Sequence, residues 1–327
     1  MDEEKLQKIN LIEVLQEEAE SEGRLIEDPP IEWSEDRIRK HFCRPDPCVP
    51  FFGPVDEVEF SKWFPGLPLS RTSCPKPRWR VVCFPNAGNA EDMYTSEGTG
   101  TRKVSSPLLE WCRSNGAECL AVQPPGRNMR MKEACITTCR HMAAALLPVL
   151  APKLQQTPYT VIAHSVGTWN AFEFLMLARA QGLSMPRHVF LSAMAAPDIP
   201  VEQRPWRQQR SLSEADFQEE CRGWDVNEVV FSPSLWPTYH SLMRADFTLF
   251  DEYEYTHKGA EPFSFPITSF FGTRDCRIKE TMVRGWAEFT TGAFECIAIE
   301  GHHLWPLVKE SKILWLDAIV ERLQKLE

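Results

Sequence analysis

The sequence predicts an α/β fold, a mostly parallel sheet with helices on both faces. Six short apolar runs have the length of buried strands, and segments of helical length separate most of them. Strands that are apolar on both faces and alternate with helices are typical of a parallel sheet covered on both sides. The expected strands are residues 79–84, 118–123, 159–164, 188–194, 267–272 and 294–299, and the expected helices are residues 104–114, 131–154, 168–182 and 279–289.

The composition is that of a globular protein with one large core. The chain has 327 residues, of which 43% are hydrophobic and 25% charged. Its formal net charge of −10 argues against a general binder of nucleic acids or anionic membranes. No apolar run reaches about 18 residues, so we expect no membrane span. The N-terminus is acidic where a signal or transit peptide is basic, and we expect a cytoplasmic monomer.

Residues 1–78 form an N-terminal extension ahead of a main domain at residues 79–327. Residues 1–22 have an acidic helical pattern, whereas residues 23–78 are rich in Pro, Trp, Phe and Cys. The proline density excludes long helices and central strands there. Because its aromatic side chains favour burial, we expect this second segment to be an ordered but irregular wrap around the main domain.

A long interval interrupts the alternation of strands and helices after residue 194. More than 70 residues separate it from the next expected strand, too many for one crossover connection. The interval is amphipathic and helical, and we predict a helical lid at about residues 200–262 over the carboxyl ends of the strands. The basic cluster PWRQQR, residues 205–210, either meets an acidic partner or forms a solvated lid edge.

The segment VIAHSVGTW, residues 161–169, resembles the Gly-x-Ser-x-Gly turn that presents a nucleophile in α/β-hydrolases. Ser165 follows an expected strand and precedes an expected helix, which is the context of such an elbow. Ala163 replaces the first glycine and adds one methyl group, while Gly167 is retained. A serine that merely caps the helix is the alternative interpretation.

A serine nucleophile needs a base, and the base needs an orienting acid, in the chain order serine, acid, histidine. The turn EGHHLWPL after the last expected strand offers His302 and His303, either of which is a candidate base, or an exposed pair without a catalytic role. The segment FFGTRDCRI offers Asp275 just after a strand, and Asp198 is the competing acid.

The developing oxyanion needs two backbone N–H donors. One comes from the residue after the nucleophile, Val166. The loop in VVCFPNAGNAEDMY supplies the other, for which we predict Ala87, with Gly88 allowing close approach. An ordinary turn is the alternative interpretation of this loop.

A series of segments, in the family's order, resembles the motifs of type II thioesterases, the stand-alone α/β-hydrolases that accompany non-ribosomal peptide and polyketide synthases. The chain-terminating thioesterases of fatty acid synthases are similar. VCFPNAGNA resembles Phe-Pro-His-Ala-Gly-Gly, AVQPPGR resembles Gln-Leu-Pro-Gly-Arg, and AHSVGTWNAFEF resembles Gly-His-Ser-Met-Gly-x-x-x-Ala-Phe-Glu. LMRADFTLFDEYEY resembles the Leu-Arg-Ala-Asp-Phe … Tyr pattern of the lid, and the segments FFGTRDCRI and EGHHLWPL resemble the acid strand and the Gly-Gly-His-Phe turn.

The resemblance covers residues 79–326 and implies an α/β-hydrolase fold with a helical lid insertion. It implies Ser165 as nucleophile, Asp275 as orienting acid and His302 as base. His302 follows Gly301 as the family histidine follows its glycine, so that His303 takes the place of the next, usually aromatic, residue.

The sequence departs from the family pattern beside the elbow and in the oxyanion loop. Asn86 replaces the loop histidine and is expected to change the polar contacts of the substrate pocket. Asn89 and Thr168 replace glycines, and Thr168 and Trp169 add bulk that is expected to narrow the acyl pocket. Arg127, in PPGR, is given no catalytic role.

The resemblance implies hydrolysis of an acyl thioester on the phosphopantetheine arm of an acyl- or peptidyl-carrier protein or a multidomain synthase, in editing or in chain release. A carboxylesterase or lipase acting on small oxygen esters and an inactive hydrolase-fold binding module are the alternatives. No metal or bound cofactor is implied, since the partner carries the phosphopantetheine. The pairs Cys43/Cys48 and Cys135/Cys139 lack nearby ligands for zinc, and we expect reduced thiols.

Overall fold

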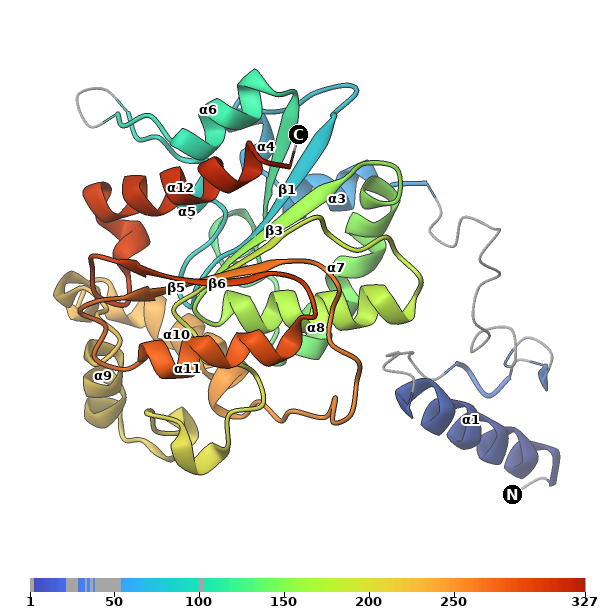
Figure 1. Cartoon of the computed structure of the whole chain (residues 1–327). Coiled ribbons are helices and arrows are strands. Elements are labelled where there is room, and N and C mark those ends of the chain that lie inside the picture. Colours follow the sequence, from blue (N-terminus) through green and yellow to red (C-terminus); the bar gives the residue numbers. More distant parts are fainter. Residues whose placement is uncertain are drawn as a thin grey trace.

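Six parallel strands form one sheet in a computed structural model that describes residues 3–21, 29–32, 34–35, 38, 54–99 and 103–326 (Figure 1). The strands are β1 Trp79–Phe84, β2 Ala117–Ala121, β3 Tyr159–His164, β4 Val189–Ser192, β5 Ile267–Gly272 and β6 Phe294–Ile299. Their order is β2-β1-β3-β4-β5-β6, and each neighbouring pair is parallel. The predicted fold class is confirmed.

The strand order reverses between β1 and β3, which are neighbours although β2 lies between them in sequence. Phe84, the last residue of β1, pairs with Ala163 near the end of β3. Loops that leave two such strands diverge and open a crevice at the carboxyl edge of the sheet, where ligands bind in open α/β sheets. The candidate nucleophile follows β3 and the candidate oxyanion loop follows β1, so both lie at this crevice.

Alternating residues of the strands feed two apolar clusters, one on each face of the sheet. Val82 and Phe84 of β1 belong to the first cluster, whereas Val81 and Cys83 belong to the second. Helices α7 and α8 complete the first cluster, and α6 and α12 complete the second, on the opposite side of the sheet (Figure 1). The α-helices are α1 Glu3–Ser21, α3 Glu57–Trp63, α4 Gly66–Leu69, α5 Asp92–Thr95, α6 Pro107–Ser114, α7 Cys139–Leu154, α8 Gly167–Ala180, α9 Glu214–Arg222, α10 Trp236–Asp251, α11 Glu280–Arg284 and α12 Lys309–Leu323.

Two helices begin later than the sequence predicts, because a side chain caps each of them. The hydroxyl of Ser106 accepts the N–H of Leu109, and Pro107 occupies the first turn of α6. The hydroxyl of Thr138 accepts the N–H of His141, so α7 begins at residue 139 rather than 131. The helix expected at residues 279–289 is divided into α11 and a 3₁₀ helix, η6 Gly285–Phe289.

The described part of the N-terminal extension contributes to the main core. Phe60 and Trp63 of α3 and Leu67 of α4 are buried in the first cluster. Both helices are short, as the proline density predicts. Ile12 of α1 packs with Ile38 in a small cluster of its own. Of the predicted wrap, residues 23–28 and 39–53 lie outside the described residues.

The long interval between β4 and β5 contains two α-helices, α9 and α10. Three short 3₁₀ helices accompany them: η3 Val201–Gln203, η4 Gln209–Ser211 and η5 Glu228–Phe231. The remaining 3₁₀ helices are η2 Asn128–Arg130 and η7 Trp305–Leu307. Across the described stretches of the chain, every helix is too short or too polar to cross a lipid bilayer.

Candidate active site

Ser165 occupies a tight turn between β3 and α8. Its φ of +53° lies in the left-handed region, as in a nucleophile elbow that aims the hydroxyl away from the sheet. A Cβ at Gly167 would lie 2.5 Å from the Phe84 carbonyl oxygen and 2.6 Å from that of Pro85, so only glycine fits there. The methyl group of Ala163 is buried in the first core cluster. The second glycine of the motif is therefore required, whereas the first position accepts alanine.

A hydrogen-bonded chain links Ser165, His303 and Asp275. The Ser165 Oγ lies 2.9 Å from Nε2 of His303, and Nδ1 of His303 lies 2.7 Å from Oδ2 of Asp275. All three side chains are buried, with exposed fractions of 6%, 1% and 4%. With Asp275 ionised, Nδ1 carries the imidazole proton and donates it to the carboxylate. Nε2 then accepts the hydroxyl proton of Ser165, which is the arrangement that a general base requires.

The histidine that contacts both Ser165 and Asp275 is His303, whereas His302, the predicted base, contacts neither. The His302 side chain is 37% exposed, and its Nδ1 accepts the N–H of Leu304 at 3.2 Å. It lies beside the carboxylate of Asp225 rather than Asp275. In the family turn Gly-Gly-His-Phe the histidine is the third residue. Matching the hydrophobic Leu304 to the phenylalanine of that turn would have selected His303.

Asp275 is held as a carboxylate by the groups around it. Burial by itself raises its pKa, but the hydrogen bond from His303, the electrostatic interaction with that imidazole and two backbone hydrogen bonds together outweigh burial, so the pKa is lowered overall. The backbone N–H groups of Arg277 and Ile278 each donate to Oδ1 at 2.9 Å and act in the same direction. The competing acid, Asp198, is exposed and takes no part in the chain.

A second histidine, His164, supports the backbone of His303. Its Nε2–H donates to the carbonyl oxygen of His303 at 2.9 Å. Burial and the nearby His303 lower the pKa of His164 to about 3, so it is neutral at neutral pH. Its ring also packs edge-on against Trp305, with 4.7 Å between the ring centroids. His164 therefore restrains the backbone of His303 while remaining uncharged.

The predicted oxyanion donors, Ala87 and Val166, both lie at the crevice. Within the described residues, neither of their backbone N–H groups donates a hydrogen bond. The side-chain amide of Asn86 donates to the carbonyl oxygen of Ala87 at 2.9 Å and so restrains the loop. Two free N–H groups beside a nucleophile have the chemical character that an oxyanion hole requires.

A buried ion pair, absent from the predicted site, fixes the oxyanion loop to the lid. Arg127 contacts Asp246 of α10 through two nitrogens, at 2.8 and 2.6 Å. Asp246 also accepts the N–H of Gly88 at 2.7 Å, and Arg127 donates to the carbonyl oxygen of Asn89 at 2.8 Å. The motifs PPGR and LMRADF contain the two charged residues, but their pairing joins positions far apart in sequence.

A small apolar cavity of about 20 Å³ lies over Ser165 and His303. Asn86 and Ala87 line it from the predicted oxyanion loop. The rest of its wall comes from the lid and the histidine turn, namely Trp224, Val226, Met243, Phe247, Phe250 and Leu304. The segment between β4 and β5, where the lid is predicted, therefore supplies much of the wall over Ser165.

Thr168 and Trp169 do not line this cavity, contrary to the prediction that they narrow the acyl pocket. The hydroxyl of Thr168 donates back to the carbonyl oxygen of Ser165 at 2.8 Å. The indole N–H of Trp169 donates to the carbonyl oxygen of Ala195, and its ring packs at a tilt against Tyr253, with 4.6 Å between the ring centroids. Both side chains therefore point into the protein behind the elbow, where they support α8.

No cluster of three or more metal-ligating side chains occurs in the described part of the chain. Cys135 and Cys139 are free thiols, and the Sγ of Cys139 donates to the carbonyl oxygen of Leu249. Cys43 and Cys48 lie outside the described residues.

Comparison with known proteins assigns the chain to a family. The family model described as thioesterase domain matches residues 80–326. The chain belongs to the thioesterase family. The predicted resemblance to type II thioesterases is thereby confirmed, and this thioesterase is a hydrolase of thioesters with the α/β-hydrolase fold.

Relatives and solved structures agree with this assignment. The gramicidin S biosynthesis protein GrsT of Aneurinibacillus migulanus is 25% identical over 270 residues, which cover 81% of this thioesterase and 95% of GrsT. The medium-chain S-acyl fatty acid synthase thioesterase of Rattus norvegicus is 24% identical over 237 residues, covering 71% and 82% of the two chains. The structure of the type II thioesterase BorB from the borrelidin biosynthetic cluster has a TM-score of 0.64 at 26% identity, covering 78% of this chain and 96% of BorB.

Proposed function

We propose that this thioesterase releases acyl groups from the phosphopantetheine arm of a carrier protein, with Ser165 as nucleophile, His303 as base and Asp275 as orienting acid. The observation that carries the proposal is the buried chain of 2.7 and 2.9 Å contacts from Asp275 through His303 to Ser165. In this proposal residues 79–327 are the catalytic domain, residues 200–262 its lid, and residues 1–78 an extension.

Acylation begins when the Oγ of Ser165 attacks the thioester carbonyl carbon and Nε2 of His303 takes the hydroxyl proton. The resulting imidazolium is stabilised by Asp275. The N–H groups of Ala87 and Val166 hold the oxyanion of the tetrahedral intermediate. The carbon–sulfur bond then breaks, and the proton on His303 passes to the departing sulfur, which leaves as the free thiol of the pantetheine arm.

Deacylation reverses the roles with water. His303 takes a proton from water as the water oxygen attacks the acyl-serine carbonyl carbon. The bond between that carbon and the Oγ of Ser165 breaks, and the proton on His303 returns to the serine. The products are a carboxylic acid and the regenerated enzyme. No metal or bound cofactor takes part in these steps.

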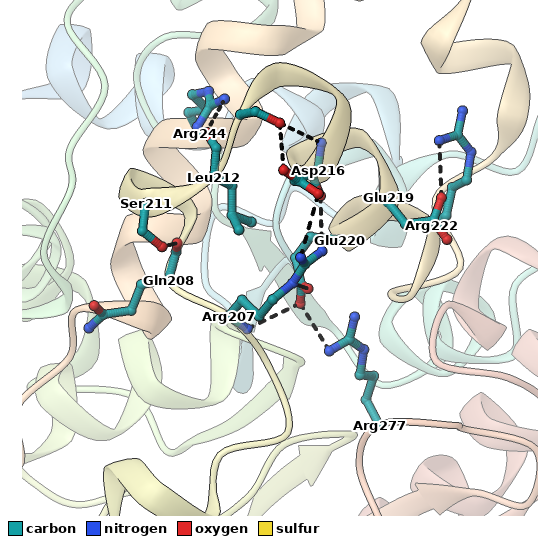
Figure 2. Close-up of polar contacts among 11 residues, drawn as sticks. Arg207, Gln208, Ser211, Leu212, Asp216, Glu219, Glu220, Arg222, Arg244 and Arg277 are labelled. Atoms are coloured by element: carbon teal, nitrogen blue, oxygen red, sulfur yellow. Dashed lines mark hydrogen bonds and ion pairs between the residues drawn. The ribbon is translucent and has the colours of Figure 1, made fainter.

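The proposed partner is an acyl- or peptidyl-carrier protein or a multidomain synthase, met by a monomeric enzyme in the cytoplasm. Its support is the set of relatives, whose names place them in gramicidin S biosynthesis and fatty acid synthesis. The basic cluster at residues 205–210 offers little unpaired positive charge to an acidic partner, because its arginines already contact carboxylates of this chain. Arg207 contacts Asp216 and Glu220 within the lid (Figure 2). Arg210 pairs with Glu252.

The test is hydrolysis of a panel of acylated carrier proteins, compared with p-nitrophenyl esters and with Ser165→Ala as the inactive control. We expect release of acyl groups from the carriers and none from Ser165→Ala. Turnover of the free esters alone would replace the proposal with a carboxylesterase. A wild-type chain that reacts with neither substrate nor a fluorophosphonate probe would instead indicate an inactive binding module.

A further inference from the structure

The lid touches both loops that carry the proposed acid and base. The contacts come from the end of α9 and the turn after it, residues 220–225, which we name the lid latch. Any catalytic role of the latch rests on the proposed roles of Ser165, His303 and Asp275.

On the histidine side, the latch binds the backbone and the ring of the base. The carboxylate of Asp225 accepts the N–H of His303 at 2.9 Å. The ring of Trp224 meets the His303 imidazole edge-on, with 4.7 Å between centroids and an interplanar angle of 70°. Asp225 has a φ of +61°, a left-handed conformation that few non-glycine residues adopt but that aspartate tolerates. The strained turn is thus held where its carboxylate reaches His303.

On the acid side, the latch is bound to the loop that follows Asp275. The guanidinium of Arg277 donates to the Gly223 carbonyl oxygen at 3.1 Å and lies 3.0 Å from the carboxylate of Glu220. Glu220 is only 1% exposed and lies between Arg277 and Arg207 (Figure 2). Opening the lid would separate the buried carboxylate of Glu220 from Arg277 and so cost free energy, because a buried charge would lose one of its two partners. This contact therefore favours the closed lid.

All four polar groups of His303 are therefore occupied, and one of the partners comes from the lid. The imidazole binds Ser165 and Asp275, and the carbonyl oxygen binds His164. Each of these three partners lies on a strand of the sheet or within three residues of its end. The N–H alone binds a lid residue, Asp225. An open lid would leave the backbone of the histidine turn without this fourth restraint.

We propose that Asp225 is a positioning residue through which the closed lid orients His303, so that Ser165 reaches full reactivity only when the lid closes. Closure over a substrate then completes the catalytic arrangement as well as excluding water. Asp225 does not line the cavity and is 29% exposed, so its role is separable from substrate binding and from core packing.

The test compares Asp225→Gly, Asp225→Asn and the control Glu228→Gln in the full-length chain. Glycine removes the carboxylate and tolerates the positive φ, whereas asparagine keeps an acceptor oxygen and also tolerates it. Glu228 pairs with Arg222 on the exposed face of the same lid, at 2.7 Å, and touches neither loop. The readouts are the rate of Ser165 labelling by a fluorophosphonate, kcat and KM for hexanoyl-N-acetylcysteamine, and hydrogen exchange at the His303 amide.

We expect Asp225→Gly to slow labelling and kcat about tenfold with KM nearly unchanged, because a hydrogen bond to a charged group is lost from the oriented base. His303 amide exchange accelerates in the same variant. Asp225→Asn recovers most of the loss, and Glu228→Gln behaves as the wild type. Wild-type labelling of Asp225→Gly, or equal slowing of Glu228→Gln, would overturn the proposal. If the wild-type chain is labelled but hydrolyses no thioester, the proposed function fails while labelling still tests the latch.

Discussion

Replacing His303 with alanine should abolish turnover, whereas the same change at His302 should leave the enzyme active. The two histidines are adjacent and chemically identical, so the pair provides its own matched control. His303 is 1% exposed with Nε2 at 2.9 Å from the Ser165 Oγ, while the His302 side chain is 37% exposed. Any difference in activity between the two variants therefore reflects the position of each histidine relative to Ser165 rather than its residue type.

The size of the expected loss follows from the contacts of the serine. In the part of the chain that the structure describes, no other side chain forms a hydrogen bond with the Ser165 Oγ. Removing the histidine of a serine-hydrolase triad lowers kcat about 10⁶-fold. At 1.36 kcal/mol for each factor of ten, this loss is about 8 kcal/mol of transition-state stabilisation. For His302→Ala we expect kcat within about twofold of wild type, as for an exposed side chain outside the reacting set.

The assay is steady-state and single-turnover hydrolysis of hexanoyl-N-acetylcysteamine, with fluorophosphonate labelling as a second measure of serine reactivity. His303→Gln is included because it preserves more of the side-chain volume against Trp224 than alanine does. Circular dichroism and thermal unfolding establish that each variant is folded. Retention of more than about 1% of wild-type kcat by His303→Ala, together with a larger loss in His302→Ala, would refute the assignment of the base.

Three further predictions concern stability, substrate choice and pH. Asp246→Asn leaves the buried guanidinium of Arg127, whose side chain is 6% exposed, without its carboxylate partner. Urea unfolding should show that the free energy of unfolding falls by about 3–5 kcal/mol. A fall of less than about 1 kcal/mol would contradict a stabilising role of this ion pair. Phe247→Ala enlarges the cavity over Ser165 and should raise kcat/KM for hexanoyl relative to acetyl thioesters about tenfold, whereas an unchanged ratio would show that the ring does not bound the acyl site. The pKa of His164 is about 3 in the folded protein, against an ordinary value of 6.5. Between these pH values the unfolded chain binds a proton that the folded protein does not. The free energy of unfolding should therefore fall as the pH drops from 6.5 towards 3. Urea titrations across this range should show a slope shallower by up to about 1.4 kcal/mol per pH unit in His164→Gln, and an unchanged slope would contradict a neutral buried imidazole.

Local sequence carried the prediction of the sheet and of the elbow. Apolar runs predict every boundary of the six strands to within two residues. The turn around Ser165 was recognisable because its backbone geometry demands small residues at fixed spacing, and Gly167 meets that demand. Asp275 and the oxyanion loop followed from their places after strands, since the carboxyl ends of parallel strands meet at one edge. Helix starts were less accurate, because single caps such as Thr138 decide them.

Tertiary packing decided which side chains of these segments reach the site and which point away from it. His302 and His303 are indistinguishable by residue type, and burial against Asp275 and Trp224 selects His303. The place of Trp169 next to the elbow in sequence predicts that it lines the pocket, but its side chain lies outside the cavity wall and donates to the carbonyl oxygen of Ala195.

By itself the sequence determined the α/β fold, the order of nucleophile, acid and histidine, and the family, because each depends on periodicity or on short motifs. Only the tertiary structure decided which residues wall the cavity, and that Asp246 and Asp225 join the lid to the site. These contacts link positions far apart along the chain. Their partners are set by how the lid packs on the sheet, which no local pattern records.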